Sequence, residues 1–258
     1  MPFITLTSDW GRKDHYLATV KGAIYSKIPE VVLVDISHDI SHYNIMEAAF
    51  VVKNSYKNFP EGTVHIIGVD SEASVKHPHT IVYADKQYFI AADTGIFSLI
   101  FDQQPEAIYE ITTFQESDVF TFPERDVFVK VACHLSMNGT PEVMGQKRDE
   151  YNILKVFNPV IEADSIRGIV IYVDAYENVV TNITRKDFSL IGKGRKFTLH
   201  FRGEELHQIH TAYSDVPHGE ILALFGATSF LEIAINKGNA CGLLGLDINE
   251  SVRIEFLS

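Results

Sequence analysis

The chain has 258 residues, of which 46% are hydrophobic and 11% aromatic, enough apolar material for one large globular core or two modest ones. Its formal net charge of −12 argues against nucleic acid or an anionic membrane as a partner, because either would need a basic face. Its 2 cysteines, Cys133 and Cys241, lie far apart in the sequence, so we expect no disulfide framework. We find no hydrophobic leader and no apolar run of ~20 residues that could span a membrane, so we expect a cytoplasmic protein.

The first half of the chain alternates apolar runs with helical periodicity, which predicts a mainly parallel sheet with flanking helices. We expect strands at residues 4–7, 31–35 and 64–70, then a pair at 80–84 and 88–92 joined by the turn Asp85-Lys-Gln87. We expect helices at residues 14–27, 44–56, 93–100 and 126–137.

The pattern changes after Gly139. Residues 140–165 are polar and are expected to be irregular, and the apolar runs beyond them are short and strand-like. These runs are residues 168–173, 179–183, 196–201, 220–225, 230–235 and 252–256. We therefore place a domain boundary near residue 160, between an N-terminal α/β domain at 1–160 and a smaller C-terminal all-β barrel domain at 161–258.

Aspartates follow three of the predicted parallel strands: Asp9, Asp35 and Asp70. In an open α/β sheet, ligands bind beyond the carboxyl ends of the strands, so Asp9 and Asp70 predict a site for a small polar molecule. The alternative is that each aspartate only caps the helix or turn that follows it.

Other kinds of site are disfavoured. Closely spaced histidines occur, but no HExxH or CxxC pattern accompanies them, so we expect no metal site. These histidine pairs are His38 and His42, His77 and His79, and His207 and His210. A GxGxxG sequence after the first strand and a Walker sequence are both missing, which disfavours a dinucleotide or nucleoside triphosphate site.

Short segments along almost the whole chain carry a more specific pattern. They are Thr7-Ser-Asp-Trp-Gly11, Val34-Asp-Ile-Ser-His38, Glu47-Ala-Ala-Phe50, Phe59-Pro-Glu-Gly-Thr-Val-His65, Val69-Asp70, Ala92-Asp-Thr-Gly95, Arg125-Asp-Val-Phe128, Val173-Asp-Ala-Tyr-Glu-Asn178 with Thr181-Asn182, and Leu231-Glu-Ile-Ala-Ile-Asn-Lys-Gly238. In this order they resemble the S-adenosylmethionine hydroxide adenosyltransferases, which are relatives of the fluorinating and chlorinating enzymes.

The resemblance implies an N-terminal α/β domain and a C-terminal β-barrel. It also implies a homotrimer whose ligand sites lie between one subunit's N-terminal domain and its neighbour's C-terminal domain. The loop insertion of the halogenating relatives is not evident between Asp70 and Asp93, which favours the hydroxide branch. The implied reaction is attack of water at the ribose C5′ of S-adenosylmethionine, giving adenosine and methionine without a separate cofactor.

The resemblance also implies roles for individual residues. Asp9 would accept hydrogen bonds from both ribose hydroxyls, because an ionised carboxylate offers two acceptor oxygens. Asn178 would read the adenine edge, Tyr176 would lie against the purine, Asp174 would meet the methionine ammonium, and Thr228 would lie near the methionine carboxylate. Further ligand contacts are expected from Trp10, Phe122, Asn236 and Lys237.

The implied catalytic triad is an aspartate, an arginine and a histidine, and this sequence keeps only the aspartate, as Asp70. His77 stands where the arginine belongs, after Lys76, and Pro123 replaces the histidine. Proline has no side-chain donor or acceptor, and histidine is only partly charged near neutral pH. Either the pocket binds an adenosyl ligand without turnover, or Asp70, His77 or Lys76, and Glu124 form a replacement set.

Three hypotheses therefore remain open. The chain is a hydrolase of S-adenosylmethionine with an altered water site, a non-catalytic binder of S-adenosylmethionine or adenosine, or a structural trimer that has lost its ligand. Retention of Asp9, Asp70, Asp174 and Asn178 argues against the third. Glu124 could instead be a solvated loop residue, and we expect Arg125 and Asp126 to brace the following helix.

Overall fold

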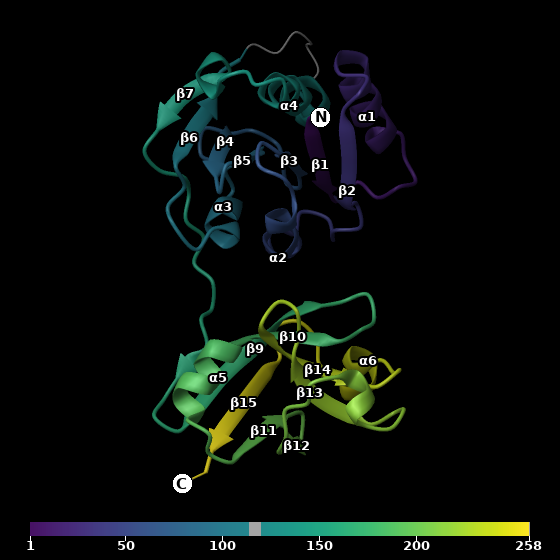
Figure 1. Ribbon diagram of the computed structural model, residues 1–258, viewed down its shortest axis with the longest axis vertical. Coiled ribbons are helices and arrows are strands. Elements are labelled where there is room, and N and C mark those ends of the chain that lie inside the picture. Colours follow the sequence, from purple (N-terminus) through teal and green to yellow (C-terminus); the bar gives the residue numbers. More distant parts are fainter. Residues whose placement is uncertain (114–119, 258) are drawn as a thin grey trace. The chain divides into compact units, whose positions relative to one another are not determined.

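The structure is a computed structural model that describes residues 1–113 and 120–257. The chain divides into two compact units, Met1–Lys155 and Val156–Ser258, each built around its own sheet (Figure 1). No helix within the described residues is long and apolar enough to cross a membrane.

The N-terminal unit contains a seven-stranded mixed sheet in the order β2-β1-β3-β5-β4-β6-β7. Strands β2, β1, β3 and β5 are parallel, whereas β4 and β7 run antiparallel to their neighbours. The predicted mainly parallel sheet is therefore confirmed. Its strands are β1 (Phe3–Ser8), β2 (Val32–Ser37), β3 (Val64–Gly68), β4 (His79–Ala84), β5 (Gln87–Ala92), β6 (Ala107–Ile111) and β7 (Gly145–Arg148).

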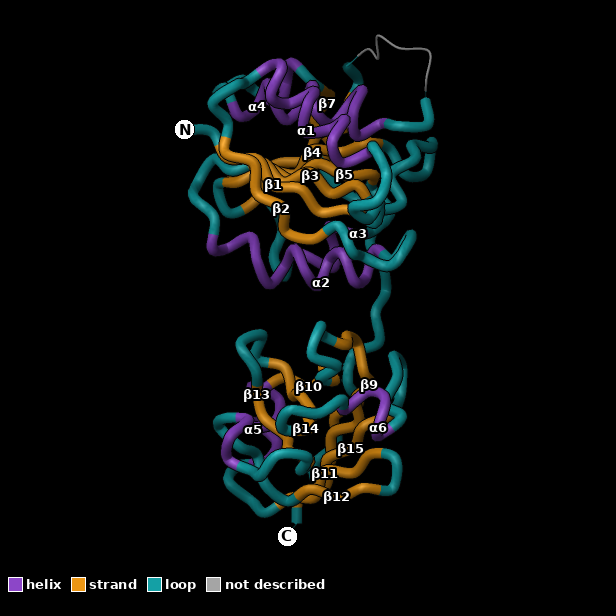
Figure 2. Tube along the Cα trace, turned by 90° about the vertical axis from the view of Figure 1, so that its right-hand side faces the viewer, coloured by secondary structure: helices purple, strands orange, loops and turns teal. Residues whose placement is uncertain are grey.

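Helices cover both faces of this sheet, α1 and α4 on one side and α2 and α3 on the other (Figure 2). Successive residues of a strand point to opposite faces, so Ile66 of β3 packs with the first pair of helices and Ile67 with the second. The Asn44 side chain caps α2 by accepting a 3.1 Å hydrogen bond from the backbone N–H of Glu47. The helices are α1 (Tyr16–Lys27), α2 (Ile45–Ser55), α3 (Ile96–Ile100) and α4 (Val129–Ser136), with 3₁₀ turns at Tyr56–Asn58 and Pro141–Val143 and a π-helical turn at Glu124–Phe128.

The C-terminal unit is a nearly closed antiparallel β-barrel, as predicted. Its strand order is β12-β11-β15-β9-β10-β14-β13, with β8 paired to β9. Inward-facing apolar residues such as Ile166, Leu199 and Ile233 form its core. The elements are β8 (Val160–Ile161), β9 (Ser165–Val173), β10 (Val179–Thr184), α5 (Arg185–Gly192), β11 (Phe197–Phe201), β12 (Glu204–Leu206), a 3₁₀ turn (Tyr213–Asp215), β13 (Ile221–Phe225), β14 (Phe230–Ile235), α6 (Ala240–Leu244) and β15 (Ser251–Phe256).

The expectation that residues 140–165 are irregular is wrong at both ends, because this stretch contains β7 and β8. Strand β7 reads Gly-Gln-Lys-Arg and lies at the edge of the sheet, so it has no buried apolar face that would reveal it in the sequence. Strand β6 and helices α5 and α6 are short and were also not predicted.

Candidate functional site

Strands β1 and β3 are parallel neighbours in which Ser8 pairs with Gly68. The residues that follow them, Asp9 and Asp70, therefore leave the sheet at the same edge. Strand β5 lies next to β3 in the same direction, so Asp93 also follows a strand at this edge. Three carboxylates thus stand at the carboxyl ends of adjacent parallel strands, where open α/β sheets bind ligands.

The loop after β1 is fixed by the turn that precedes α2. The Oδ2 atom of Asp9 accepts a 2.8 Å hydrogen bond from the backbone N–H of Tyr43. Within the described residues, the Oδ1 atom of Asp9 has no hydrogen-bond partner and is available to a ligand. The Trp10 ring stacks on His38 at 6.3 Å between centroids and meets Phe122 edge-on at 5.8 Å.

His38 packs beneath Trp10 and stabilises the loop after β1. The side chain is fully buried, its Nδ1 lies 2.7 Å from the Ser8 hydroxyl oxygen, and its Nε2 lies 3.1 Å from Asp35 Oδ1. In the described part of the chain, no group of three His, Cys, Asp or Glu side chains is arranged to hold a metal ion. The contacts of His38 connect the ends of β1 and β2.

Glu124 is 3% exposed, which contradicts the interpretation of a solvated loop residue. Its Oε1 accepts a hydrogen bond from the Ser71 hydroxyl, and the Trp10 indole N–H donates a second hydrogen bond to the carboxylate. Burial raises the pKa of Glu124, the negative charge of Asp9 raises it further, and the two hydrogen bonds oppose this. The carboxyl approaches β3 so closely that a Cβ on Gly68 would lie 2.9 Å from Glu124 Cγ.

The loop that follows β3 carries Asp70, Ser71 and His77. Asp70 is exposed and has a left-handed backbone, with φ of 47°. The Ser71 carbonyl accepts a 2.8 Å hydrogen bond from His79 Nε2, which is possible only when that nitrogen carries the proton. His77 is exposed, and its backbone N–H donates to the Ser74 hydroxyl at 3.0 Å.

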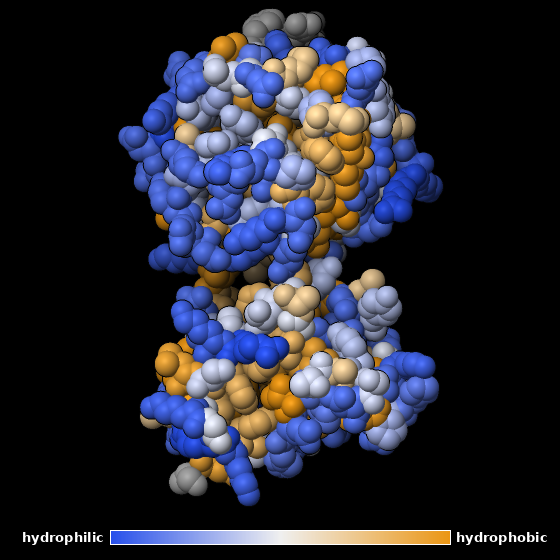
Figure 3. Space-filling view, viewed as in Figure 1, coloured by the Kyte–Doolittle hydropathy of each residue, from blue (hydrophilic) through white to orange (hydrophobic). Residues whose placement is uncertain are grey.

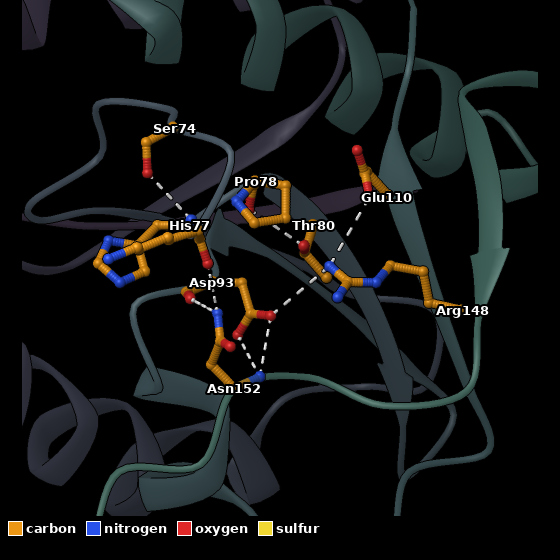
Figure 4. A network of polar contacts seen from close by, with 9 residues as sticks. Ser74, His77, Pro78, Thr80, Asp93, Glu110, Arg148 and Asn152 are labelled. Atoms are coloured by element: carbon orange, nitrogen blue, oxygen red, sulfur yellow. Dashed lines mark hydrogen bonds and ion pairs between the residues drawn. The ribbon is translucent and has the colours of Figure 1, made fainter.

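A buried polar network centred on Asp93 ties this loop to the end of the N-terminal unit (Figure 4). Both Asp93 carboxylate oxygens accept the backbone N–H of Asn152 at 3.0 Å. The Asn152 side-chain amide donates to the carbonyls of Lys76 at 2.8 Å and Asp93 at 2.6 Å. Arg148 Nη1 lies 3.9 Å from Asp93 Oδ2 and 3.7 Å from Glu110 Oε2.

The charges around Asp93 oppose the effect of its burial. Burial raises the pKa of Asp93, whereas the Asn152 backbone N–H and the charges of Arg148 and His77 lower it. From the sequence, Asp93 is expected to start a helix and belongs to the segment Ala92-Asp-Thr-Gly95, but it is given no role in the site, although it follows an apolar strand as Asp9 and Asp70 do.

In the C-terminal unit, three predicted ligand residues share one turn. Asp174 Oδ1 accepts the backbone N–H groups of Tyr176 at 2.9 Å and Asn178 at 2.8 Å, and its Oδ2 accepts the Asn178 side-chain amide at 3.0 Å. In this arrangement Asp174 stabilises the turn. Asn178 is buried, whereas Tyr176 is 80% exposed and open to contact.

The other predicted residues of this unit lie on neighbouring turns. The Thr228 hydroxyl accepts the backbone N–H of Phe230 at 3.4 Å, and the Asn236 side-chain amide donates to the Val216 carbonyl at 2.7 Å. Lys237 is exposed and has a left-handed φ of 56°.

Strand β14 carries a buried carboxyl that the sequence does not single out. Glu232 is 7% exposed and accepts a 2.5 Å hydrogen bond from the Tyr213 hydroxyl. Burial raises the pKa of Glu232 and the charge of Asp174 raises it further, whereas the hydrogen bond from Tyr213 opposes this. The alternation of strand β14 predicts only that Glu232 faces one side of the barrel.

Both parts of the chain match family models. Residues 4–145 match the SAM hydroxide adenosyltransferase N-terminal domain, and residues 168–253 match the SAM hydroxide adenosyltransferase C-terminal domain. The chain is 24% identical to the (R)-S-adenosyl-L-methionine hydrolase of Thermus thermophilus over 96% of this chain and 97% of the relative. It is 25% identical to the enzyme of the same name from Methanocaldococcus jannaschii over 99% and 97%.

A relative named fluorinase and two solved structures are also similar to almost the whole chain. A fluorinase from Nocardia brasiliensis is 24% identical over 98% of this chain and 97% of its own length. The crystal structure of an uncharacterized conserved protein from Thermotoga maritima superposes with a TM-score of 0.88 at 30% identity, covering 98% of this chain and 99% of that one. A conserved hypothetical protein from Thermus thermophilus shares the fold, with a TM-score of 0.78 at 24% identity, covering 98% of this chain and 100% of that one.

Proposed function

Because the chain belongs to the SAM hydroxide adenosyltransferase family, we propose that it hydrolyses S-adenosylmethionine to adenosine and methionine. The observation that carries the proposal is the cluster at the carboxyl ends of β1 and β3, where Asp9, Trp10, Phe122 and Glu124 lie together beside the loop of Asp70. Its similarity to hydrolases named for this reaction supports the same conclusion.

The reaction requires mainly that the protein align the attacking water with the ribose carbon. The sulfonium of S-adenosylmethionine is a good leaving group, so the site must hold water in line with C5′ and make it a better nucleophile. Asp9 binds the ribose hydroxyls, for which its Oδ1 atom is available, and Asp70 orients the water. The other ligand contacts are Trp10, Phe122, Asp174, Tyr176, Asn178, Thr228, Asn236 and Lys237.

The water site differs from the triad that the family resemblance implies. Positive charge comes from His77 or Lys76 in place of an arginine, and Glu124 provides a carboxyl next to Pro123, which has no side-chain acceptor. A buried carboxyl whose pKa is raised is better matched to proton transfer near neutral pH than an ordinary one.

We also propose that the protein is a homotrimer in which neighbouring subunits supply the two sets of ligand residues. Edge strand β2 supports an assembled state, because its apolar residues are only half-buried in the single chain. Hydrophobic side chains gather on this face of the N-terminal unit (Figure 3). Surfaces of this kind are commonly covered by another subunit.

The test is to incubate the purified protein with S-adenosylmethionine and to quantify adenosine and methionine by chromatography. The proposal expects the two products in equal amounts, and it expects Asp70→Asn to lower turnover about a hundredfold or more. If neither product accumulates above the uncatalysed rate, the proposed hydrolysis is wrong.

A second candidate function is non-catalytic binding of S-adenosylmethionine or adenosine, and Pro123 is the observation that favours it. If this alternative holds, S-adenosylmethionine should raise the melting temperature without being consumed. Asp9→Ala should remove most of that stabilisation, because a lost partner of a charged hydrogen bond costs ~2–5 kcal/mol.

A further inference from the structure

We propose that Ser71 and Glu124 form the pair that accepts the proton of the attacking water, a role for Ser71 that rests on the proposed hydrolysis. Ser71 directly follows Asp70 and is half-buried, so it lies between the exposed side of the loop and the buried carboxyl. Its hydroxyl already donates to Glu124 Oε1. The pair thus connects the position of Asp70 to a proton acceptor inside the N-terminal unit.

The backbone of Ser71 is held independently of its hydroxyl. The Ser71 carbonyl accepts the hydrogen bond from His79 Nε2 at 2.8 Å. The His79 ring in turn packs edge-on against Phe128, with ring centroids 4.8 Å apart. The His79 side chain therefore holds the Ser71 carbonyl, while the hydrogen bond to Glu124 Oε1 orients the Ser71 hydroxyl.

The carboxyl of Glu124 is also held in place. It belongs to the π-helical turn that precedes α4, receives a second hydrogen bond from Trp10 and packs over Gly68. At 3% exposure it has little direct access to solvent, whereas the Ser71 hydroxyl bridges it to the half-buried side of the loop. A proton therefore reaches Glu124 most directly through Ser71.

The proton and electron balance closes without another reactant. The water oxygen forms a bond to C5′ as the C5′–S bond breaks, and that electron pair remains on the methionine sulfur. The water proton passes to Ser71 Oγ while the Ser71 hydroxyl proton passes to Glu124. The products are adenosine, methionine and a neutral Glu124, which then loses its proton to solvent.

Ser71 and Glu124 together provide a proton acceptor, which Pro123, in the place of the triad histidine, cannot provide. A serine hydroxyl donates one proton and accepts another, so it can relay a proton without changing its own charge. The charge change falls on Glu124, whose pKa is raised by burial and by the charge of Asp9, so its carboxylate accepts a proton more readily than an exposed one would.

The experiment compares steady-state adenosine release by Ser71→Ala, Ser71→Thr, Glu124→Gln and wild type. We expect Ser71→Ala and Glu124→Gln to lower kcat about a hundredfold or more, with KM for S-adenosylmethionine changed less than about threefold. Ser71→Thr keeps the hydroxyl and should retain most of the rate. Ser74→Ala is the matched control on the same loop, because its hydroxyl contacts only the backbone of His77 in the described structure, and it should behave as wild type.

The outcomes separate this inference from the proposed function. Full kcat in Ser71→Ala, with wild type active, would overturn the relay and leave hydrolysis standing. Equal losses in Ser71→Ala and Ser71→Thr would also overturn it, because the hydroxyl would then not matter. Absence of adenosine from wild type would overturn the hydrolysis itself and the relay with it. If Glu124→Gln does not fold, the two Ser71 variants still decide the question.

Discussion

Gly68 provides the space in which Trp10 and Glu124 approach strand β3. A Cβ at this position would lie 2.5 Å from Trp10 Cζ2 and 2.9 Å from Glu124 Cγ, both too close for unperturbed packing. We expect Gly68→Ala to displace these side chains, to lower the free energy of unfolding by about 1–3 kcal/mol and to reduce adenosine release at least tenfold. Urea denaturation and the chromatographic assay measure the two effects.

Gly22 in α1 is the matched control, because a Cβ there would meet nothing within 4 Å. Gly22→Ala should leave the activity unchanged and stabilise the protein slightly, since alanine favours a helix over glycine by up to about 1 kcal/mol. Equal behaviour of the two variants would show that Gly68 is not needed for close packing.

His65 is a buried neutral residue of strand β3. Its Nδ1 lies 2.7 Å from the Thr5 hydroxyl and its Nε2 lies 2.7 Å from the Gln87 side-chain oxygen. Burial lowers the pKa of His65 from 6.5 to about 4, which the hydrogen bond to Gln87 only partly offsets. Below pH 6.5 the unfolded chain therefore binds a proton that the folded protein does not accept until about pH 4.

This difference makes stability pH-dependent. The stabilisation is present in full above pH 6.5 and is lost as the pH falls toward 4. Between pH 7.5 and pH 5 we expect a loss of about 2 kcal/mol in the free energy of unfolding from this residue. Urea titrations of wild type and His65→Gln at both pH values measure it, and an equally large pH dependence in the variant would exclude His65 as the cause.

At the scale of elements, the Asp93 network joins the loop after β3 to the segment after β7. The Asn152 side-chain amide holds the carbonyls of Lys76 and Asp93, and Leu154 N–H donates to the Ser98 hydroxyl at 3.0 Å. Two segments with no regular structure are thereby fixed to the end of β5 and to α3. Through the Lys76 carbonyl, this connection also holds the loop that carries Asp70, Ser71 and His77.

We expect Asn152→Ala to loosen residues 71–78 without unfolding the N-terminal unit, because the Asn152 backbone N–H still binds Asp93. Of the two side-chain hydrogen bonds removed, the one to the Lys76 carbonyl holds the loop, and its loss, roughly 1 kcal/mol, should speed amide exchange of the loop about fivefold to tenfold. Hydrogen exchange with mass spectrometry measures this. Asn58→Ala removes an exposed local hydrogen bond and serves as the control, and equal exchange in the two variants would contradict the role of Asn152.

Local sequence patterns predicted the elements that are buried and strongly apolar. Strands β1 and β3 are buried along most of their length, so their apolar runs identified them and the edge to which Asp9 and Asp70 belong. Edge strand β7 has no such run. The pairing of Ser71 with Glu124 spans 53 residues and that of Asp93 with Asn152 spans 59, so tertiary folding creates contacts that no local pattern contains.

At the scale of the whole molecule, the predicted ligand residues are divided between two separately packed units. Asp9 and Trp10 belong to Met1–Lys155, and Asp174 and Asn178 to Val156–Ser258. Each unit has its own hydrophobic core, so each unit positions its own set of predicted residues. In the proposed homotrimer the two halves come from different chains, which makes subunit mixing a direct test.

Mixing Asp9→Ala with Asn178→Ala subunits tests whether the site is shared. Each variant alone should bind adenosine weakly, because every site lacks one contact. In a mixed cyclic trimer, one interface joins an intact N-terminal domain from the Asn178→Ala chain to an intact C-terminal domain from the Asp9→Ala chain. Random mixing makes about three quarters of the trimers mixed, with one restored site in three, so about a quarter of the sites should bind with wild-type affinity.

Calorimetry of co-refolded subunits measures that fraction, and Asp9→Ala mixed with Trp10→Ala is the control, because two defective N-terminal domains cannot complement each other. Recovery of no sites in the first mixture, with trimers verified by light scattering, would place both halves of the site in one chain.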